Sequence, residues 1–241
     1  MPLNRKRFDL NADLGEGCGQ DEGLMPLVSS ASIATGAYAG DDSTALAAIL
    51  MARQHAVVVG AHPGFPDFEN FGRVAQEMSA GEVERMVIEQ CRHLQRLAGA
   101  VGVFLPYLKP HGALYHQTLM QPTYALGVVR AAARLSMALM IQPVGVVVGI
   151  AQSHGVSLVR EGFLDRRYNA DGTLVARSRP NAMLTDPDEI RDQLVHLIDN
   201  RMIDSLCIHG DSPHACQLAR WVHGWADELG DEIRSVWQRV D

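Results

Sequence analysis

Short β-rich runs alternate with longer amphipathic runs along most of this sequence, and this alternation constrains the fold more than any other feature. Strand-forming segments separated by helical segments are typical of repeated βα units, whose strands run parallel. The pattern predicts seven strands, at residues 8–11, 32–36, 56–60, 102–108, 139–144, 156–159 and 205–208. With 241 residues and no Pro/Gly/Ser-rich or charge-block linker, the chain is expected to form one α/β domain, residues 1–241.

Several predicted helix ends carry their own signals. Ser79 with Glu82 three residues later forms a capping box ahead of an amphipathic run at residues 81–98. Other ends are predicted by capping residues before proline and by a C-terminal glycine, at Asp186-Pro187, Ser212-Pro213 and Gly230.

Polar residues cluster at the C-terminal ends of six of the seven predicted strands. The candidates at these ends are Asn11, Asp13, Glu16, Asp41, His62, Lys109, His111, Asp165, Arg166, His209 and Asp211. In a closed βα barrel these ends converge on one mouth, whereas an open doubly wound sheet binds ligands only at a switch point. The distribution therefore favours a barrel with a site at its mouth. The other histidines fall on predicted helices and are expected on the surface or in packing: His55, His93, His116, His154, His196, His214 and His223.

Lys109 stands out because the chain has two lysines beside nineteen arginines. An ammonium is a compact charge whose pKa falls readily on burial, whereas a guanidinium is forked and always charged. Lys109 precedes Pro110 and His111 at a predicted strand end, so an amine and an imidazole lie at the end of the same strand. This combination points to a chemical role, and an exposed lysine before a turn proline is the plain alternative.

Charge and cysteine usage narrow the function classes. A net charge of −7 without a basic stripe argues against nucleic acid and favours small molecules or proteins as partners. No apolar run has membrane-spanning length and residues 1–10 lack the apolar core of a signal peptide, so we expect a cytoplasmic protein without membrane association. Cys18, Cys91, Cys207 and Cys216 are scattered, which predicts reduced thiols and no structural metal.

Six segments match the motifs of a known family. In chain order they are DLNADLGEG from Asp9, GAHPGFPD from Gly60, FGR from Phe71, KPHGALY from Lys109, FLDRRY from Phe163 and CIHGD from Cys207. Through them the chain resembles the LamB/YcsF family, from about residue 8 to residue 229. The family's characterised function is the A component of bacterial ATP-dependent 5-oxoprolinase, and its fold is similar to an irregular, TIM-like (β/α)7 barrel of the glycoside hydrolase and deacetylase superfamily. The resemblance implies hydrolytic opening of a small lactam, 5-oxoproline, to glutamate, together with two further subunits.

One stretch departs from the family pattern. Where the family typically reads NIACGFHAGD, residues 32–41 of this chain read SIATGAYAGD. Asp41 is kept, but tyrosine at position 38 removes a candidate base or metal ligand and leaves only a hydrogen-bond donor. A divergent relative with altered substrate or reduced activity is one reading of this change.

Opening a lactam needs a polarised carbonyl, an activated nucleophile and a protonated leaving nitrogen. We assign the acid–base work to Asp13, Lys109 and His111. Substrate binding is assigned to the other strand-end residues, Asn11, Glu16, Asp41, His62, Asp165, Arg166, His209 and Asp211. A five-membered lactam is stable relative to its open acid, so ATP coupling is expected. Because the chain has no G-x-x-x-x-G-K-[ST] loop, ATP is expected to be handled with the partner subunits.

Two other function classes stay open. A metal-dependent deacetylase would use Asp13, His62 and His111 as ligands of a divalent ion. A non-catalytic scaffold for the partner subunits is the other class, suggested by the altered stretch at residues 32–38. Association of the chain with copies of itself also stays open.

Residues 163–184 are predicted to form a hairpin flap over the mouth. The sequence Asn-Ala-Asp-Gly at residues 169–172 is a turn signal between two short β-like runs. The flap carries the arginines Arg166, Arg167, Arg177 and Arg179. Guanidinium forks suit a carboxylate or a phosphate, and Arg166 is predicted to bind the substrate anion, with a solvated arginine face as the alternative.

Overall fold

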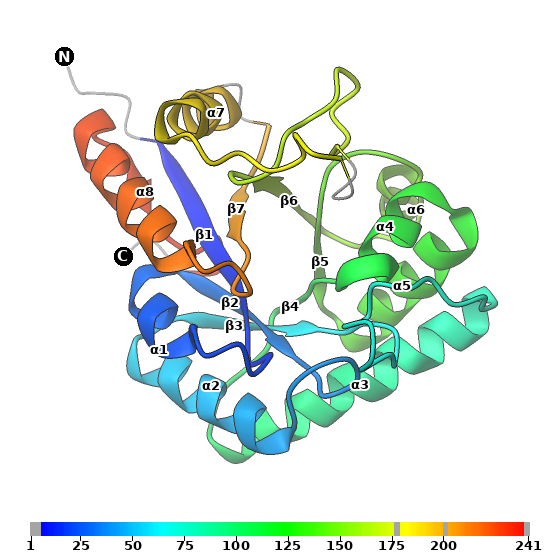
Figure 1. Ribbon diagram of the computed structural model, residues 1–241. Coiled ribbons are helices and arrows are strands. Elements are labelled where there is room, and N and C mark those ends of the chain that lie inside the picture. The colour runs from blue at the N-terminus through cyan, green and yellow to red at the C-terminus, as the bar shows by residue number, and fades with distance from the viewer. Residues whose placement is uncertain (1–5, 176–178, 200–201, 239–241) are drawn as a thin grey trace.

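Seven parallel strands close into a barrel (Figure 1), and a short eighth strand pairs with the start of the first. The computed structural model describes residues 6–175, 179–199 and 202–238. The strands are β1 (Arg7–Leu14), β2 (Ser30–Ala34), β3 (Val58–His62), β4 (Tyr107–Leu108), β5 (Ala138–Ile141), β6 (Leu158–Phe163), β7 (Ser205–Ile208) and β8 (Glu232–Ile233). They pair in chain order from β2 to β7, and β1 closes the ring between β7 and β2. The predicted (β/α)7 barrel is therefore confirmed.

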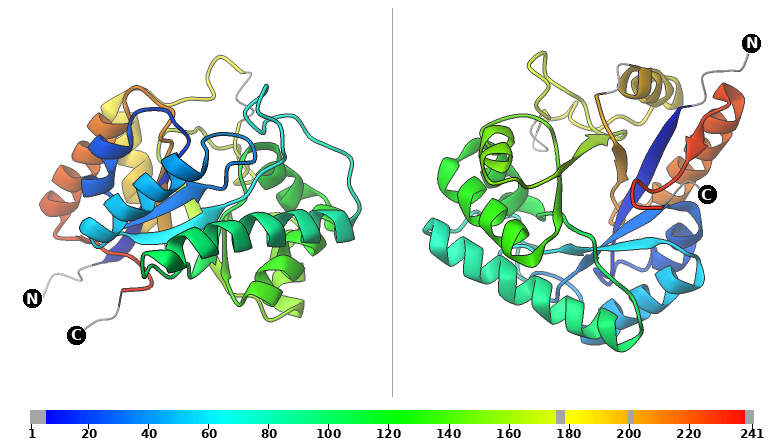
Figure 2. Two further views of the ribbon diagram at one scale, coloured as in Figure 1. Left: turned by 90° about the horizontal axis from the view of Figure 1, so that it is seen from below. Right: turned by 180° about the vertical axis from the view of Figure 1, so that it is seen from behind.

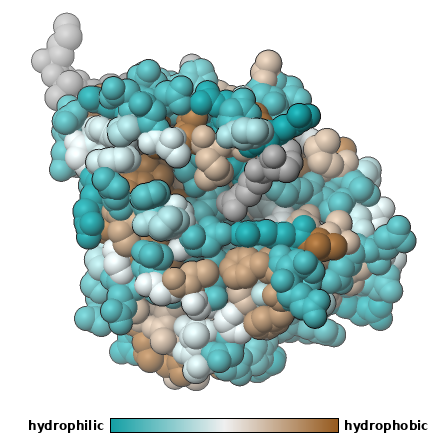
Figure 3. All heavy atoms as spheres, in the orientation of Figure 1, coloured by the Kyte–Doolittle hydropathy of each residue, from teal (hydrophilic) through white to brown (hydrophobic). Residues whose placement is uncertain are grey.

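Helices surround the barrel, as the two further views show (Figure 2). They are α1 (Asp21–Leu24), η1 (Met25–Leu27), α2 (Asp42–Gln54), α3 (Ala80–Ala100), α4 (Gly112–Met120), α5 (Pro122–Leu135), α6 (Val147–Ser153), α7 (Pro187–Asp199) and α8 (Ala215–Leu229). Hydrophilic side chains are spread over the face in Figure 3, with apolar ones between them. Among the residues described, no helix is long and apolar enough to cross a bilayer.

Strand β1 explains why this barrel can carry a polar site. Its residues Leu10, Ala12 and Leu14 belong to the large hydrophobic core. The alternate residues, from Asp9 to Asp13, hydrogen-bond to side chains of other barrel strands. Because successive side chains of a strand point to opposite faces, one face of β1 packs against apolar neighbours while the other supplies a buried polar column.

Several strand boundaries differ from the prediction. β1 and β6 run further than predicted, so Asp13 and Glu161 lie within strands. β4 is only two residues long, because Pro106 has no N–H to donate to a ladder. β3 begins at Val58, since Ala56 adopts a φ of 56° in the turn after α2. β8, which pairs with the start of β1, was not predicted.

Helix-end signals were mostly correct. Ser79 and Glu82 form the predicted capping box of α3, and the Asp186 carboxylate accepts hydrogen bonds from the first backbone N–H groups of α7. Gly230 ends α8 with a φ of 74°. The Ser-Pro pair ahead of α8 forms a turn instead of the first helical residues, and the helix begins at Ala215.

The segment at residues 163–184 lies beside the mouth, between β6 and α7 (Figure 1). Antiparallel bridges join Tyr168 to Leu174 and Arg166 to Met183. The chain reverses at the predicted turn, where the Gly172 N–H donates to the Asn169 carbonyl. Of the four arginines predicted here, Arg177 lies outside the described residues.

Gly60 offers a direct test of packing inside the barrel. A Cβ at this position would lie 2.2 Å from the ring of Tyr107, which stacks on Trp237. Gly60→Ala is therefore expected to lower the free energy of unfolding by about 1–3 kcal/mol through overpacking. Gly81 in α3 is the matched control, since an added Cβ there meets nothing within 4 Å and alanine should stabilise the helix by up to about 1 kcal/mol. Denaturant titrations of both variants measure the difference, and equal stabilities would contradict this packing.

Candidate active site

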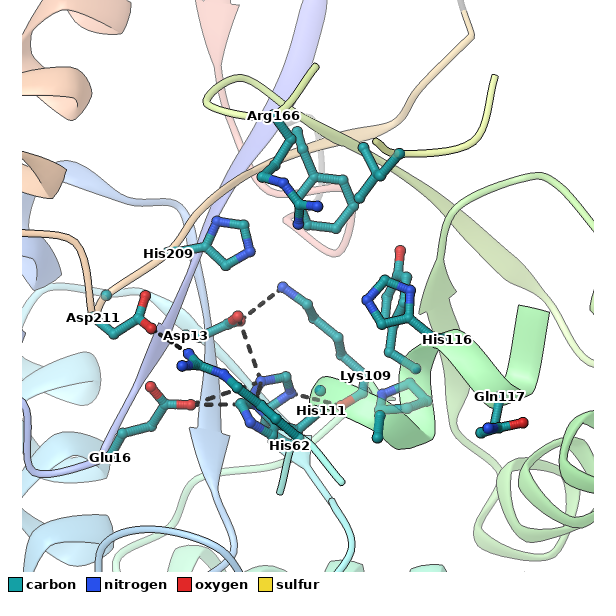
Figure 4. A pocket seen from close by; sticks show the side chains of 18 of the residues that line it. Asp13, Glu16, His62, Lys109, His111, His116, Gln117, Arg166, His209 and Asp211 are labelled. Atoms are coloured by element: carbon teal, nitrogen blue, oxygen red, sulfur yellow. Dashed lines mark hydrogen bonds and ion pairs between the residues drawn. The ribbon is translucent and has the colours of Figure 1, made fainter. Parts of the chain in front are cut away.

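A cavity of about 540 Å³ opens at the C-terminal ends of the strands (Figure 4). Eight of the eleven predicted site residues line it: Asp13, Glu16, His62, Lys109, His111, Arg166, His209 and Asp211. Asp13 and His62 lie in β1 and β3, and the other six lie in the segments that follow β1, β4, β6 and β7. The barrel thus brings together side chains that are up to about 200 positions apart in the sequence.

Three predicted site residues do not line the cavity. Asn11 lies deeper in the barrel, where its amide donates to Ser205 and its carbonyl accepts from Lys109. Asp165 is buried behind His209. The placement of Asp41 at the mouth was wrong, because its carboxylate accepts from the Thr44 backbone N–H and caps helix α2.

Lys109 is held as an ammonium at the bottom of the cavity. Its Nζ lies 2.7 Å from Asp13 Oδ1, 2.6 Å from Glu161 Oε1, 3.1 Å from Asn11 Oδ1 and 3.2 Å from Cys207 Sγ. Burial alone would lower the pKa of Lys109, but the carboxylate of Asp13, with further contributions from Cys207 and Glu161, raises this pKa well above its usual value. Lys109 therefore stays protonated in this site.

Asp13 is the negative partner at the same place. One carboxylate oxygen accepts from Lys109, and the other lies 3.4 Å from His62 Nε2. Burial would raise its pKa, but His62 and Lys109 hold the pKa of Asp13 well below the usual range. Asp13 is thus an ionised carboxylate with fixed orientation.

His62 and His111 meet edge to face beside Asp13. His62 Nδ1 lies 2.7 Å from the Lys109 carbonyl oxygen, and His111 Nε2 lies 2.9 Å from that of Phe71. A carbonyl can only accept, so these two ring nitrogens carry hydrogen. The remaining nitrogens, His62 Nε2 and His111 Nδ1, are 3.1 Å apart. Burial, reinforced by His62, lowers the pKa of His111 to about 2, so this ring is neutral.

Glu16 and Tyr38 complete this side of the cavity. The buried Tyr38 hydroxyl donates to Glu16 Oε1 at 3.0 Å, and its ring stacks on His111 with a centroid separation of 3.7 Å. Burial and the neighbouring Asp13 raise the pKa of Glu16 to about 7. Position 38, where the family typically has histidine, therefore supports His111 and Glu16 from behind the cavity wall.

His209 forms a second polar pair across the cavity. Its Nδ1 lies 2.9 Å from Asp165 Oδ2, and its ring stacks on Phe163 with a centroid separation of 5.4 Å. Asp165 is buried and His209 lines the cavity. The carboxylate fixes the hydrogen on Nδ1, which leaves Nε2 as the other functional nitrogen of the ring.

Sequence reasoning missed several residues of the site. His116, assigned to the surface or to packing, lines the cavity from α4 together with Tyr115. Arg73 also lines the cavity and forms an ion pair with Asp211 at the rim. Glu161 lies inside β6 and pairs with Lys109. The FGR segment contains Arg73, the KPHGALY segment contains Tyr115 and is followed directly by His116, and Glu161 could have been noticed as a glutamate at the end of an apolar strand.

Two groups of side chains could hold a metal ion. The ligand atoms of Glu16, His62 and His111 lie within 4.8 Å of one another, and so do those of Asp13, Cys207 and His209. The predicted metal set of Asp13, His62 and His111 overlaps the first group. Asp13 approaches this group through its Oδ2 atom, 3.4 Å from His62 Nε2.

Known proteins resemble the chain in both sequence and structure. A Neisseria meningitidis protein named as a 5-oxoprolinase subunit is 40% identical over 228 residues, which cover 89% of this chain and 93% of that protein. The crystal structure of a lactam utilization protein from Thermus thermophilus superposes with a TM-score of 0.89 at 35% identity, over 95% of this chain and 99% of that one.

A more distant similarity extends to deacetylases. The catalytic domain of a peptidoglycan N-acetylglucosamine deacetylase from Eubacterium rectale superposes with a TM-score of 0.56 at 8% identity, over 100% of this chain and 96% of that one. At this identity the similarity concerns the fold alone. The LamB/YcsF family profile matches residues 8–240. With a match of this extent and a relative at 40% identity, the chain belongs to the LamB/YcsF family.

Proposed function

We propose that this chain is the hydrolytic component of an ATP-dependent 5-oxoprolinase and opens 5-oxoproline to glutamate. Relatives named as 5-oxoprolinase subunits, together with a lactam utilization protein, support a 5-oxoprolinase-related role. The observation that carries the proposal is that two polar pairs serve one cavity. Asp165 with His209 can move a proton, and Lys109 with Asp13 supplies fixed charge.

The Asp165–His209 pair is suited to proton transfer. With Nδ1–H held by Asp165 at 2.9 Å, Nε2 of His209 is the nitrogen that can accept a proton. In the proposed reaction His209 takes a proton from a water molecule whose oxygen bonds to the lactam carbonyl carbon. The C–N bond then breaks, and the same proton goes to the leaving nitrogen. This assigns to His209 a role that sequence reasoning gave to Asp13, Lys109 and His111.

Lys109 and Asp13 contribute electrostatics. The ammonium donors of Lys109 are already engaged by its neighbours, so its proposed role is to hold Asp13 in place and to keep positive charge at the bottom of the cavity. Preorganised charge of this kind favours negative charge that develops on a carbonyl oxygen. Because Lys109 is 2% exposed, water screens its field only weakly.

Arg166 is the proposed binding group for the substrate carboxylate. It lines the cavity from the segment after β6, where one guanidinium nitrogen donates to the Val175 carbonyl at 2.8 Å. That bond fixes the position of the guanidinium, which suits recognition of an anion. 5-Oxoproline carries one carboxylate beside its neutral lactam amide. Arg166 would bind the carboxylate, while the amide would lie near Lys109 and His209 in the same cavity.

ATP coupling is proposed to depend on partner subunits. The chain lacks a P-loop motif, so the purified chain with ATP and 5-oxoproline should release no glutamate. Addition of the partner subunits should start turnover, measured as glutamate and inorganic phosphate formed together. ATP-dependent turnover by the chain alone would contradict the division of labour. A reconstituted complex that leaves 5-oxoproline intact but deacetylates an N-acetyl sugar would instead favour the deacetylase reading.

A further inference from the structure

We infer that Asp9 and Ser205 are positioning residues, which hold the Lys109 ammonium in place through Asn11 although neither of them reaches the cavity. Both are fully buried and lie outside the described lining of the cavity. They pair with each other toward the N-terminal ends of β1 and β7, whereas the cavity lies at the C-terminal ends of the strands. The inference rests on the proposed function, which assigns Lys109 its role, and it adds residues that act on the site from a distance.

A chain of hydrogen bonds connects the two ends of the barrel interior. The Lys109 ammonium donates to Asn11 Oδ1 at 3.1 Å. Asn11 Nδ2 donates to Ser205 Oγ at 2.8 Å, and the Ser205 hydroxyl donates to Asp9 Oδ2. All four side chains belong to residues that are at most 2% exposed. Because water is excluded from these bonds, each of them is electrostatically stronger than in solvent.

The direction of each bond in this chain is fixed. An ammonium has only donors, so the carbonyl oxygen of Asn11 must face Lys109. Ser205 gives its one hydroxyl hydrogen to Asp9, so its oxygen is left to accept from the NH₂ group of Asn11. The two ends therefore require the same orientation of the Asn11 amide. A turned amide would place N–H groups against the Lys109 ammonium.

Asp9 is held as an acceptor by three serines. Ser29 donates to its Oδ1 atom at 2.7 Å, and Ser30 and Ser205 donate to Oδ2. Ser29 also accepts from the Leu10 backbone N–H at 2.9 Å, which leaves its hydroxyl hydrogen for Asp9. Burial raises the pKa of Asp9, and the three hydroxyls oppose this rise. The Asp9 carboxylate is thus the fixed end of the chain.

Lys109 needs an anchor of this kind because several acceptors compete for its hydrogens. Its Nζ lies 2.7 Å from Asp13 Oδ1 and 2.6 Å from Glu161 Oε1, in addition to the contact with Asn11. Asn11 Nδ2 also donates to Glu161 Oε1, at 3.3 Å. With Asn11 fixed, the ammonium keeps one hydrogen on its amide and directs others to the two carboxylates. The orientation of Asp13 at the cavity then follows from that of Asn11.

Stabilisation of the fold alone is the competing explanation. Buried hydrogen bonds contribute to stability wherever they lie, so a loss of stability does not distinguish the two explanations. The environment of the ammonium does. The chain has only two lysines, so labelling lysine side chains with ¹³C and ¹⁵N gives one set of signals from Lys109 and one from Lys6. Lys6 pairs with Asp199 in a partly exposed position and serves as the internal reference.

The experiment compares the full chain with Ser205→Ala and Asp9→Asn, each of which interrupts the chain of bonds. We expect both variants to shift the side-chain signals of Lys109 and to increase the exchange rate of its ammonium hydrogens by about 10-fold, while the Lys6 signals stay in place. In the reconstituted complex, kcat for 5-oxoproline should fall by about 10-fold with KM nearly unchanged. This split is expected because the charge of Lys109 acts on the transition state.

Ser30→Ala is the matched control. It removes a hydroxyl that donates to the same oxygen of Asp9, but Ser30 lies on β2 and, in the part of the chain that the structure describes, its hydroxyl does not bond to Asn11. The Lys109 signals and kcat should therefore match those of the unchanged chain. Thermal melting of each variant establishes that it is folded, and Asp9→Asn decides the test if Ser205→Ala does not fold.

Three results would overturn the inference. The first is unchanged Lys109 signals and exchange in Ser205→Ala and Asp9→Asn. The second is an equal effect of Ser30→Ala, and the third is normal kcat in both interrupted variants. Shifted Lys109 signals together with an unchanged chain that forms no glutamate even in the complex would instead refute the proposed function and support the hold of Asp9 and Ser205 on the ammonium.

Discussion

Replacing Lys109 by methionine is expected to lower the free energy of unfolding by about 3–5 kcal/mol. Methionine matches the length of lysine but carries no charge, so the buried Glu161 would lose its cation and Asp13 would keep only its contact with His62. Removing one partner of a buried ion pair costs this much because the other charge stays buried and uncompensated. Denaturant unfolding monitored by circular dichroism measures the loss.

The only other lysine provides the control. Lys6 pairs with Asp199 where both side chains are partly exposed, so Lys6→Met should change stability by less than about 1 kcal/mol. Adding Glu161→Gln to Lys109→Met should recover part of the loss, because one of the two buried charges is then removed. If Lys109→Met unfolds at the same denaturant concentration as the unchanged chain, the ion pairs at the bottom of the cavity contribute little to the fold.

His209→Gln is expected to lower the turnover of the reconstituted complex by about 100-fold or more. Glutamine keeps much of the size and polarity of the imidazole but cannot accept and return a proton, and general acid–base catalysis typically contributes 10²–10⁴-fold. Since the side-chain amide of glutamine can still donate to Asp165, the melting temperature should change little, although the stacking on Phe163 is lost. Steady-state release of glutamate, measured beside thermal melting, gives both quantities.

Two further variants define what the loss means. Asp165→Asn should also reduce turnover, because an amide can turn its NH₂ group toward Nδ1 and select the wrong tautomer. His93→Gln is the surface control: the contacts of His93 with Asp42 and Arg96 are exposed and lie away from the cavity, so turnover should be unchanged. Near-normal turnover in His209→Gln would assign proton transfer to another residue of the cavity.

The mouth of the barrel could be predicted because strand ends are local features. A polar residue directly after an apolar run, as at His62 or Lys109, identifies the end of a strand, and barrel closure then places all such ends together. Lys109 was also marked by composition, as one of only two lysines. Both signals survive errors of a few residues in the strand boundaries.

The remaining assignments required three-dimensional information. Glu161 was given no role because its importance depends on the ion pair with Lys109, which follows β4 and approaches from another part of the chain. Asp41 was misplaced because a carboxylate before a helix can either cap it or face a ligand, and sequence does not decide between these uses. The position and role of the Tyr38 side chain depend on its stacking with His111, a residue 73 positions away. The direction of the Lys109 pKa shift depends on which charged side chains are buried beside it, here Asp13 and Glu161.

The closure of the ring by β1 has a consequence for how this chain folds. Pairing of β1 with β2 joins segments close in sequence, whereas pairing with β7 joins Asn11 to Cys207. Contacts of such long sequence separation form late, because the entropy of loop closure opposes them until many other contacts exist. Asp13 lies in β1 and His209 follows β7, so the two sides of the cavity come together when these two strands pair. A barrel in which β1 and β7 have not yet paired therefore has no complete cavity, and ligand binding requires the fully closed barrel.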